Sequence, residues 1–156
     1  MSTRSETRTD RSKLGLPVWA LAALALLAAP RVALHDLGVA VTGPLAGLLA
    51  IGPALIWIVA AVRSKALWPW ATGLVIGAFY GCILAIGHNL FWDKAFADGP
   101  PKLGGNLENR MPAGAEEVVM RIAASFSSVF TGIAVGLLCG LVATVIQRIA
   151  ARSGKQ

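Results

Sequence analysis

Charge is scarce in this chain of 156 residues, and it is confined to a few short segments. Asp, Glu, Lys and Arg make up 14% of the residues, whereas a soluble domain has about 25%. Hydrophobic residues reach 56%, and the mean hydropathy is +0.67. This composition excludes an ordinary soluble domain and is typical of a chain embedded in a lipid bilayer.

Cysteine is almost absent. Cys82 and Cys139 both stand inside apolar stretches, and helices placed on those stretches separate them by roughly 8 Å along the membrane normal, at 1.5 Å rise per residue. A disulfide does not tolerate that separation comfortably. We therefore expect two small apolar core residues.

The chain also lacks a catalytic motif, a cofactor fingerprint and a complete metal-ligand pattern, so we predict neither an enzyme nor a bound cofactor. No acidic or basic residue stands in the middle of an apolar stretch. That absence counts against a proton-coupled pump or a cation transporter, in which buried carboxylates usually mark the path.

The net charge of +6 could indicate binding to nucleic acid. Nucleic-acid binders concentrate Lys and Arg on one exposed face, but here these residues bracket the apolar stretches. Basic residues in such places orient membrane helices and favour anionic lipid headgroups. We therefore predict the lipid bilayer as a partner, and no nucleic acid.

Four long stretches without charge predict an all-α membrane protein with four transmembrane helices in a compact antiparallel bundle. The transmembrane domain covers residues 14–150, between a disordered tail at 1–13 and a tail at 151–156. A short inner turn joins the second and third helices. The expected helices and the long outer loop are residues 14–34, 37–62, 67–91 and 114–150, with the loop at 91–118.

The first apolar stretch has a rival interpretation as a cleaved signal peptide, because a basic segment precedes it. The cleavage chemistry is poor, however. The small pair Ala28 and Ala29 is followed at once by Pro30, and the Ala-x-Ala match at 23–25 leaves a very short apolar core. We count this stretch as the first transmembrane helix.

The basic residues also predict an orientation, because cytoplasmic ends are enriched in Lys and Arg. With both termini cytoplasmic, nine basic residues lie inside and five outside, and the protein is a multi-pass protein of the cell membrane. The tryptophans, Trp19, Trp57, Trp68, Trp70 and Trp92, then fall near the two boundaries as interfacial anchors. The inner basic residues are Arg4, Arg8, Arg11, Lys13, Arg63, Lys65, Arg148, Arg152 and Lys155, and the outer ones are Arg31, Lys94, Lys102, Arg110 and Arg121.

Small residues recur at four-residue spacing in three of the predicted helices. This spacing keeps them on one helix face as a groove, which allows two backbones to approach closely. The pattern predicts close helix packing, either within the chain or with another copy or a partner membrane protein. The most plausible partner of the fourth helix is the third. The helix-packing residues are Gly43 and Gly47 in the second helix, Gly73, Gly77 and Gly81 in the third, and Ser128, Gly132, Gly136 and Gly140 in the fourth.

Polar residues gather at the predicted outer ends of the helices. His35, Asp36, His88 and Asp93 are candidates for a divalent metal site or a proton relay, because imidazole and carboxylate groups serve both. Their spacing matches no compact ligand motif, and the alternative is simple exposure to interfacial water. Asp36 would also cap the second helix at its N-terminus.

Glu117 and Arg121 stand four residues apart, in the order that favours a helical ion pair. A solvated pair that stiffens the start of the fourth helix is a sufficient interpretation.

For function, the sequence favours a non-enzymatic membrane component that acts as an accessory subunit or associates with itself. The alternative is a subunit of a small oligomeric channel or transporter, whose polar lining could come only from Ser125, Ser127, Ser128, Thr131 and Thr144. An enzyme that uses the outer histidines and carboxylates is a third hypothesis.

Overall fold

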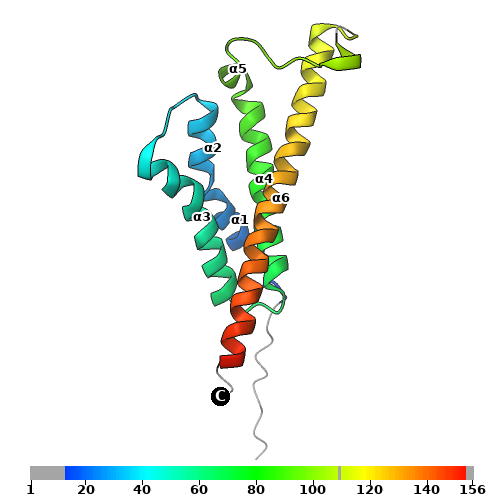
Figure 1. Cartoon of the computed structure of the whole chain (residues 1–156). Coiled ribbons are helices and arrows are strands. Elements are labelled where there is room, and N and C mark those ends of the chain that lie inside the picture. The colour runs from blue at the N-terminus through cyan, green and yellow to red at the C-terminus, as the bar shows by residue number, and fades with distance from the viewer. Residues whose placement is uncertain (1–12, 109, 154–156) are drawn as a thin grey trace, which may run out of the picture.

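The computed structural model describes residues 13–108 and 110–153, and every regular element in these residues is a helix. The predicted tails at 1–13 and 151–156 therefore lie outside the described residues, apart from Lys13 and the last turn of the final helix. Figure 1 shows the arrangement of the elements. They are α1 (Val18–Leu26), α2 (Ala29–Asp36), α3 (Gly43–Arg63), α4 (Pro69–Leu90), α5 (Trp92–Ala95), the 3-10 helix η1 (Gly105–Leu107) and α6 (Ala113–Ser153).

Four helical segments are long and apolar enough to cross a membrane. They are Val18–Asp36, which combines α1 and α2, followed by α3, α4 and α6. At 1.5 Å per residue, the 41 residues of α6 extend roughly 60 Å, about twice the hydrocarbon thickness of a bilayer. The α6 helix is therefore longer than a single crossing of a bilayer requires.

The first span is interrupted, although the sequence predicted one helix over 14–34. Pro30 has no backbone N–H to continue the preceding helix, and α1 ends at Leu26 with α2 beginning at Ala29. At the break, the carbonyl of Leu24 accepts hydrogen bonds from the backbone N–H of Leu27 (3.2 Å) and from Nε1 of Trp57 (2.7 Å). The Trp57 side chain of α3 thus pairs with a backbone carbonyl group at the break between α1 and α2.

The second predicted helix, at 37–62, begins later than expected. Residues 37–42 are not helical, and α3 starts at Gly43. Gly38 and Gly43 both have positive φ, +70° and +66°, a conformation that glycine adopts without steric cost. These glycines let the chain leave α2 and turn back into α3.

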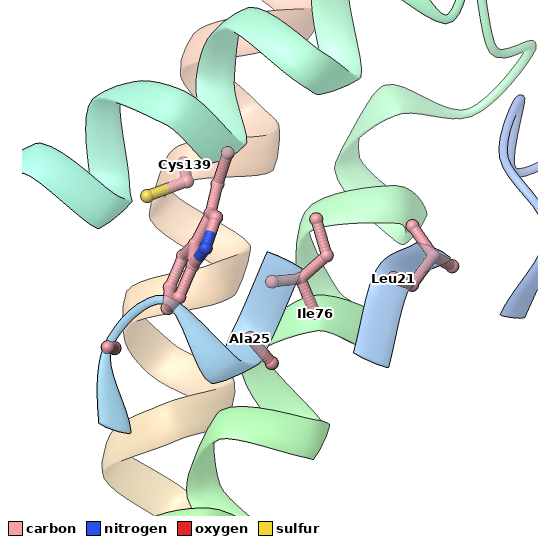
Figure 2. Close-up of a cluster of buried hydrophobic side chains, with 6 residues drawn as sticks. Leu21, Ala25, Ile76 and Cys139 are labelled. Atoms are coloured by element: carbon pink, nitrogen blue, oxygen red, sulfur yellow. The ribbon is translucent and has the colours of Figure 1, made fainter. Parts of the chain in front are cut away.

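The α1 helix buries one of its faces in the core of the molecule. Leu21 and Ala25 have no exposed surface, and they share a buried cluster with Ile76 of α4 and Cys139 of α6 (Figure 2). The α1 helix thus contributes side chains to the core of the structure.

The closest packing joins α4 and α6, which run in opposite directions (Figure 1). Gly73, Gly77 and Gly81 face Gly132, Gly136 and Gly140 so closely that no side chain fits between them. A Cβ atom on Gly136 would lie only 2.5 Å from Cα of Gly77. Ser128 is buried at the same face, beside Gly81. Direct backbone contact of this kind is how helices associate in lipid.

Gly43 and Gly47 do not take part in this packing. A Cβ atom added to either residue would meet nothing within 4 Å in the described part of the chain. Within the described residues they therefore pack against no helix of this chain, and their packing against another chain stays a prediction. The physical reason is that the first half of α3 leans away from α4 and α6, as Figure 1 shows.

At the end of the molecule that carries the α3–α4 turn, residues near both ends of the chain contact α3, α4 and the turn between them. Thr72 donates a hydrogen bond to the carbonyl of Leu14 (2.9 Å). Gly15, at φ +71°, lies against Ser64, where an added Cβ would be 2.5 Å from the serine hydroxyl. From α6, Gln147 donates to two carbonyl groups at the end of α3. We call this the turn end, and we call the end that carries residues 37–42 and 91–112 the loop end.

Two of the five tryptophans contradict their assignment as interfacial anchors. Trp57 and Trp92 are only 2% and 3% exposed, because each is enclosed by neighbouring helices. Trp19, Trp68 and Trp70 are exposed. Both cysteines are free, as expected, but only Cys139 is buried. The expectation that Cys82 is a core residue is wrong, because its side chain lies on an exposed face of α4.

Candidate functional site at the loop end

The candidate site is centred on Asp36, the last residue of α2, which is only 1% exposed. Its Oδ2 atom lies 2.8 Å from Nδ1 of His88, and its Oδ1 atom lies 3.1 Å from Nδ1 of His35. The expectation that Asp36 caps the N-terminus of the second helix is wrong. The carboxylate points to α4 instead, because α2 continues through Asp36 before the chain turns.

Gly87, which the sequence reasoning missed, allows α2 to approach α4 at this level. A Cβ atom on Gly87 would lie 2.8 Å from Cγ1 of Val32 and 3.5 Å from Oδ2 of Asp36. The absence of that atom brings the two helices close enough for Asp36 to reach His88. The only hint in the sequence is a glycine directly before a polar residue.

The two histidines differ in exposure. The side chain of His35 is 80% exposed and that of His88 is 32% exposed, and both line the same cavity. A carboxylate only accepts hydrogen bonds, so Nδ1 of each interacting ring carries the proton.

The four residues proposed for metal binding do not form one ligand set. His35, Asp36 and His88 meet, but Asp93 is 93% exposed and its carboxylate lies 3.4 Å from Arg121. No group of three or more His, Cys, Asp or Glu side chains in the described ranges is arranged to hold a metal ion. Both imidazoles instead use Nδ1 to bind the carboxylate of Asp36.

Arg121 joins the other polar residues of the loop end. It forms an ion pair with Glu117 at 2.8 Å and donates a hydrogen bond to the backbone carbonyl of Asn89 at 3.1 Å. Its guanidinium also lies 4.8 Å from the centre of the Trp92 ring, in the geometry of a cation–π contact. Arg121 therefore does more than stiffen its own helix, because it holds the ends of α4, α5 and α6 together.

A second polar contact lies one turn deeper. The side-chain amide of Asn89 donates to the hydroxyl of Ser125 (2.8 Å), which itself donates to the carbonyl of Arg121. Inside the apolar layer such a contact satisfies groups that lipid cannot solvate. It fixes the register of α4 against α6 at the level of the candidate site.

A cavity of about 370 Å³ opens beside the buried carboxylate. Trp92 lines it, and the indole Nε1 of this buried ring has no hydrogen-bond partner in residues 13–108 and 110–153. Phe96 packs against the Trp92 ring, with centroids 4.7 Å apart. The full lining consists of His35, Asp36, Gly38, His88, Trp92, Lys94, Ala95, Phe96, Ala124 and Ser127.

Comparison of the chain with family models, with curated proteins and with solved structures found no match. The chain is therefore identified by its own architecture, as an all-helical protein with four segments able to span a membrane.

Proposed function

We propose that this chain is a non-enzymatic accessory component of the cell membrane, which binds a transmembrane helix of another protein beside α3. In this proposal the four spans form an antiparallel bundle with both termini in the cytoplasm and the loop end outside. The distribution of Lys and Arg supports that orientation.

The observation that carries the proposal is the exposure of the loop-end half of α3, residues 43–52. In the other half of α3, Trp57 and Ala61 are buried against the rest of the chain. In the loop-end half, Leu45, Leu48 and Ile51 are more than half exposed. The glycine faces of α4 and α6 already pack against each other, so α3 is the span with free small residues.

Polar groups beside this half of α3 distinguish it from a surface made only for lipid. Pro53 has no N–H, so the carbonyl of Leu49 lacks its usual helical partner. Arg31 of α2 lines the same crevices as Leu49, and its guanidinium makes one long hydrogen bond, 3.4 Å, to the carbonyl of Ala46. Charged groups near lipid normally pair with another polar group.

Arg31 also favours a different protein over a second copy of this chain. A twofold-symmetric pair places the same patch of both copies in contact, which would bring two Arg31 side chains close together. Like charges in a medium of low dielectric repel strongly. A partner helix with a carboxylate or a free carbonyl at this level fits better.

The channel or transporter alternative gains no support from the hydroxyl groups of α6. Ser125, Ser128 and Thr144 each donate a hydrogen bond to a carbonyl four residues earlier in the same helix. The donors of these three hydroxyl groups are thus used within α6.

In-membrane photocrosslinking tests the proposal. A photoreactive amino acid at Leu48 should capture one distinct polypeptide in native membranes, whereas the same residue at Phe130, which is 74% exposed on α6, should not. The Arg31→Gln variant should reduce capture at position 48. Equal capture at both positions, capture that is unaffected by Arg31→Gln, or capture only of a second copy of the chain would contradict the proposal.

A further inference from the structure

The fold separates the acidic residues from many of the basic ones. Of the eight acidic residues, Glu6 and Asp10 lie outside the described residues, and the others all lie at the loop end. The turn end therefore carries basic residues and no acidic residue of the described ranges, where the α3–α4 turn and the end of α6 come together (Figure 1). The basic residues of the turn end are Lys13, Arg63, Lys65, Arg148 and Arg152.

These basic groups find no acidic partner in residues 13–108 and 110–153. All the ion pairs of those ranges involve Asp36, Asp93 or Glu117, which lie at the loop end. Like charges that are gathered at one end of a molecule repel one another. An anionic surface relieves this repulsion, and basic residues next to a membrane span attract anionic lipids in this way.

A crevice of about 300 Å³ lies within this basic end, between the start of α4 and the last turns of α6. Arg148 lines it from α6, whereas Leu67, Trp68 and Trp70 line it from the other side. These three apolar side chains are about half exposed. A guanidinium group beside large exposed apolar side chains fits a molecule with an anionic head and an apolar chain.

Contacts within the chain hold both walls of the crevice in place. The side-chain amide of Gln147 donates to the carbonyl groups of Ala61 and Val62, both at 3.1 Å, and so fixes α6 beside the end of α3. On the other wall, the rings of Trp68 and Trp70 stack with centroids 6.5 Å apart. The ammonium group of Lys13 lies 5.1 Å from the centre of the Trp68 ring, which brings a second positive charge to this wall.

We propose that this crevice binds the headgroup region of an anionic phospholipid. The guanidinium of Arg148 donates to the phosphate oxygens, for which its planar fork is suited. The indole rings of Trp68 and Trp70 lie against the glycerol and the first acyl carbons, at the level where tryptophan gathers in membranes. The apolar wall favours a lipid over a free phosphate ion. The site uses α4 and α6 and does not depend on the proposed partner helix beside α3.

The indole N–H resonances of Trp68 and Trp70 provide a direct test, in the full chain labelled with ¹⁵N-tryptophan and held in a phosphate-free maltoside detergent. The Trp68→Phe and Trp70→Phe variants identify the two resonances. Trp57 is the internal reference, because its N–H already donates to Leu24. The titrants are short-chain phosphatidylglycerol, phosphatidylcholine of the same chain length, and soluble glycerol phosphate.

Two variants that remove one positive charge each are compared. Arg148→Gln changes the crevice, whereas Lys102→Gln removes an exposed charge at the loop end. Phosphatidylglycerol should shift the Trp68 and Trp70 resonances saturably and leave that of Trp57 in place. Arg148→Gln should weaken this binding about fivefold, as expected for one basic residue near a lipid surface, and Lys102→Gln should not weaken it.

The same titrations can overturn the proposal. Phosphatidylcholine, which has no net charge, should bind at least about fivefold more weakly than phosphatidylglycerol, and glycerol phosphate should leave both resonances in place. The inference fails if no lipid moves the two resonances, or if phosphatidylcholine binds as well as phosphatidylglycerol. It also fails if glycerol phosphate alone reproduces the shift, or if Arg148→Gln and Lys102→Gln have equal effects.

Discussion

Replacing Gly136 with alanine should separate α4 from α6. The added Cβ would lie 2.5 Å from Cα and 2.7 Å from the backbone nitrogen of Gly77, and closer still to the carbonyl of Gly73. Favourable contact between carbon atoms needs about 3.5–4.0 Å. These neighbours are backbone atoms of a helix, so the strain cannot be relieved by a side-chain rotation. The two helices must therefore move apart by about 1 Å.

The cost follows from that displacement. A gap of about 0.5–1 Å already forfeits a quarter to a half of the dispersion energy of each contact, and it does so along the whole ladder from Gly73 to Gly81. Overpacked cores typically lose about 1–3 kcal/mol. Lipid supplies no hydrophobic drive to restore the contact. We expect Gly136→Ala to lower the free energy of unfolding by about 1–3 kcal/mol.

Gly47→Ala is the matched control, because Gly47 lies in another apolar span and an added Cβ meets nothing described within 4 Å. Alanine is the better helix former by about 1 kcal/mol, so this variant should be as stable as the parent or more so. Equilibrium unfolding in mixed micelles, titrated with SDS and followed by circular dichroism, compares the two. If Gly136→Ala unfolds at the same SDS fraction as Gly47→Ala, the close contact between α4 and α6 is wrong.

Three further variants test other parts of the structure by the same titration. Trp57→Phe should cost about 1–2 kcal/mol, because the ring still fills its place but the hydrogen bond to the carbonyl of Leu24 is lost. Asp36→Asn should cost about 1–3 kcal/mol, because an amide has only one acceptor oxygen for two imidazole donors; its effect on the His88 ring should appear as a shifted ¹⁵N resonance. Gly15→Ala should cost more than about 1 kcal/mol, since alanine at positive φ is strained.

An exposed tryptophan of α1 serves as the control for Trp57→Phe in the same titration. Trp19→Phe removes an indole that is 75% exposed and should leave stability nearly unchanged. If Trp57→Phe behaves like Trp19→Phe, the hydrogen bond at the break in the first span does not contribute. An unchanged His88 resonance in Asp36→Asn would likewise exclude contact between the two side chains.

The sequence predicts the spans well because the bilayer sets their length and composition. A run of about 20 apolar residues is the length that a helix needs to cross the bilayer. Glycines at four-residue spacing lie on one face of a helix, whichever helix that face contacts. The sequence predicts that the glycines of α6 pack most plausibly against those of α4, and these two sets are in contact in the structure. The spacing does not tell which set of glycines stays without a partner in the described chain. Gly43 and Gly47 show the same spacing as Gly73 and Gly77, but only the latter pair faces another helix.

The candidate site was only partly predictable. The helix ends group His35, Asp36 and His88 by level in the membrane, but no local pattern indicates that Asp36 becomes buried. Its burial depends on a late turn out of α2 and on the missing side chain of Gly87. The burial of Trp92 could not be predicted either, because it depends on the short helix α5 and on the position of Arg121. The sequence therefore suggested an interfacial anchor.

The side of the membrane that carries the loop end can be measured directly. In a background with both native cysteines replaced, Cys82→Ala and Cys139→Ala, single cysteines are placed at Gly104 in the loop or at Ser153 at the end of α6. Both positions are exposed. An impermeant thiol reagent on intact cells should label position 104 at once and position 153 only after the membrane is opened. Labelling of position 153 alone on intact cells would contradict the proposed orientation, in which both termini are cytoplasmic and the loop end lies outside.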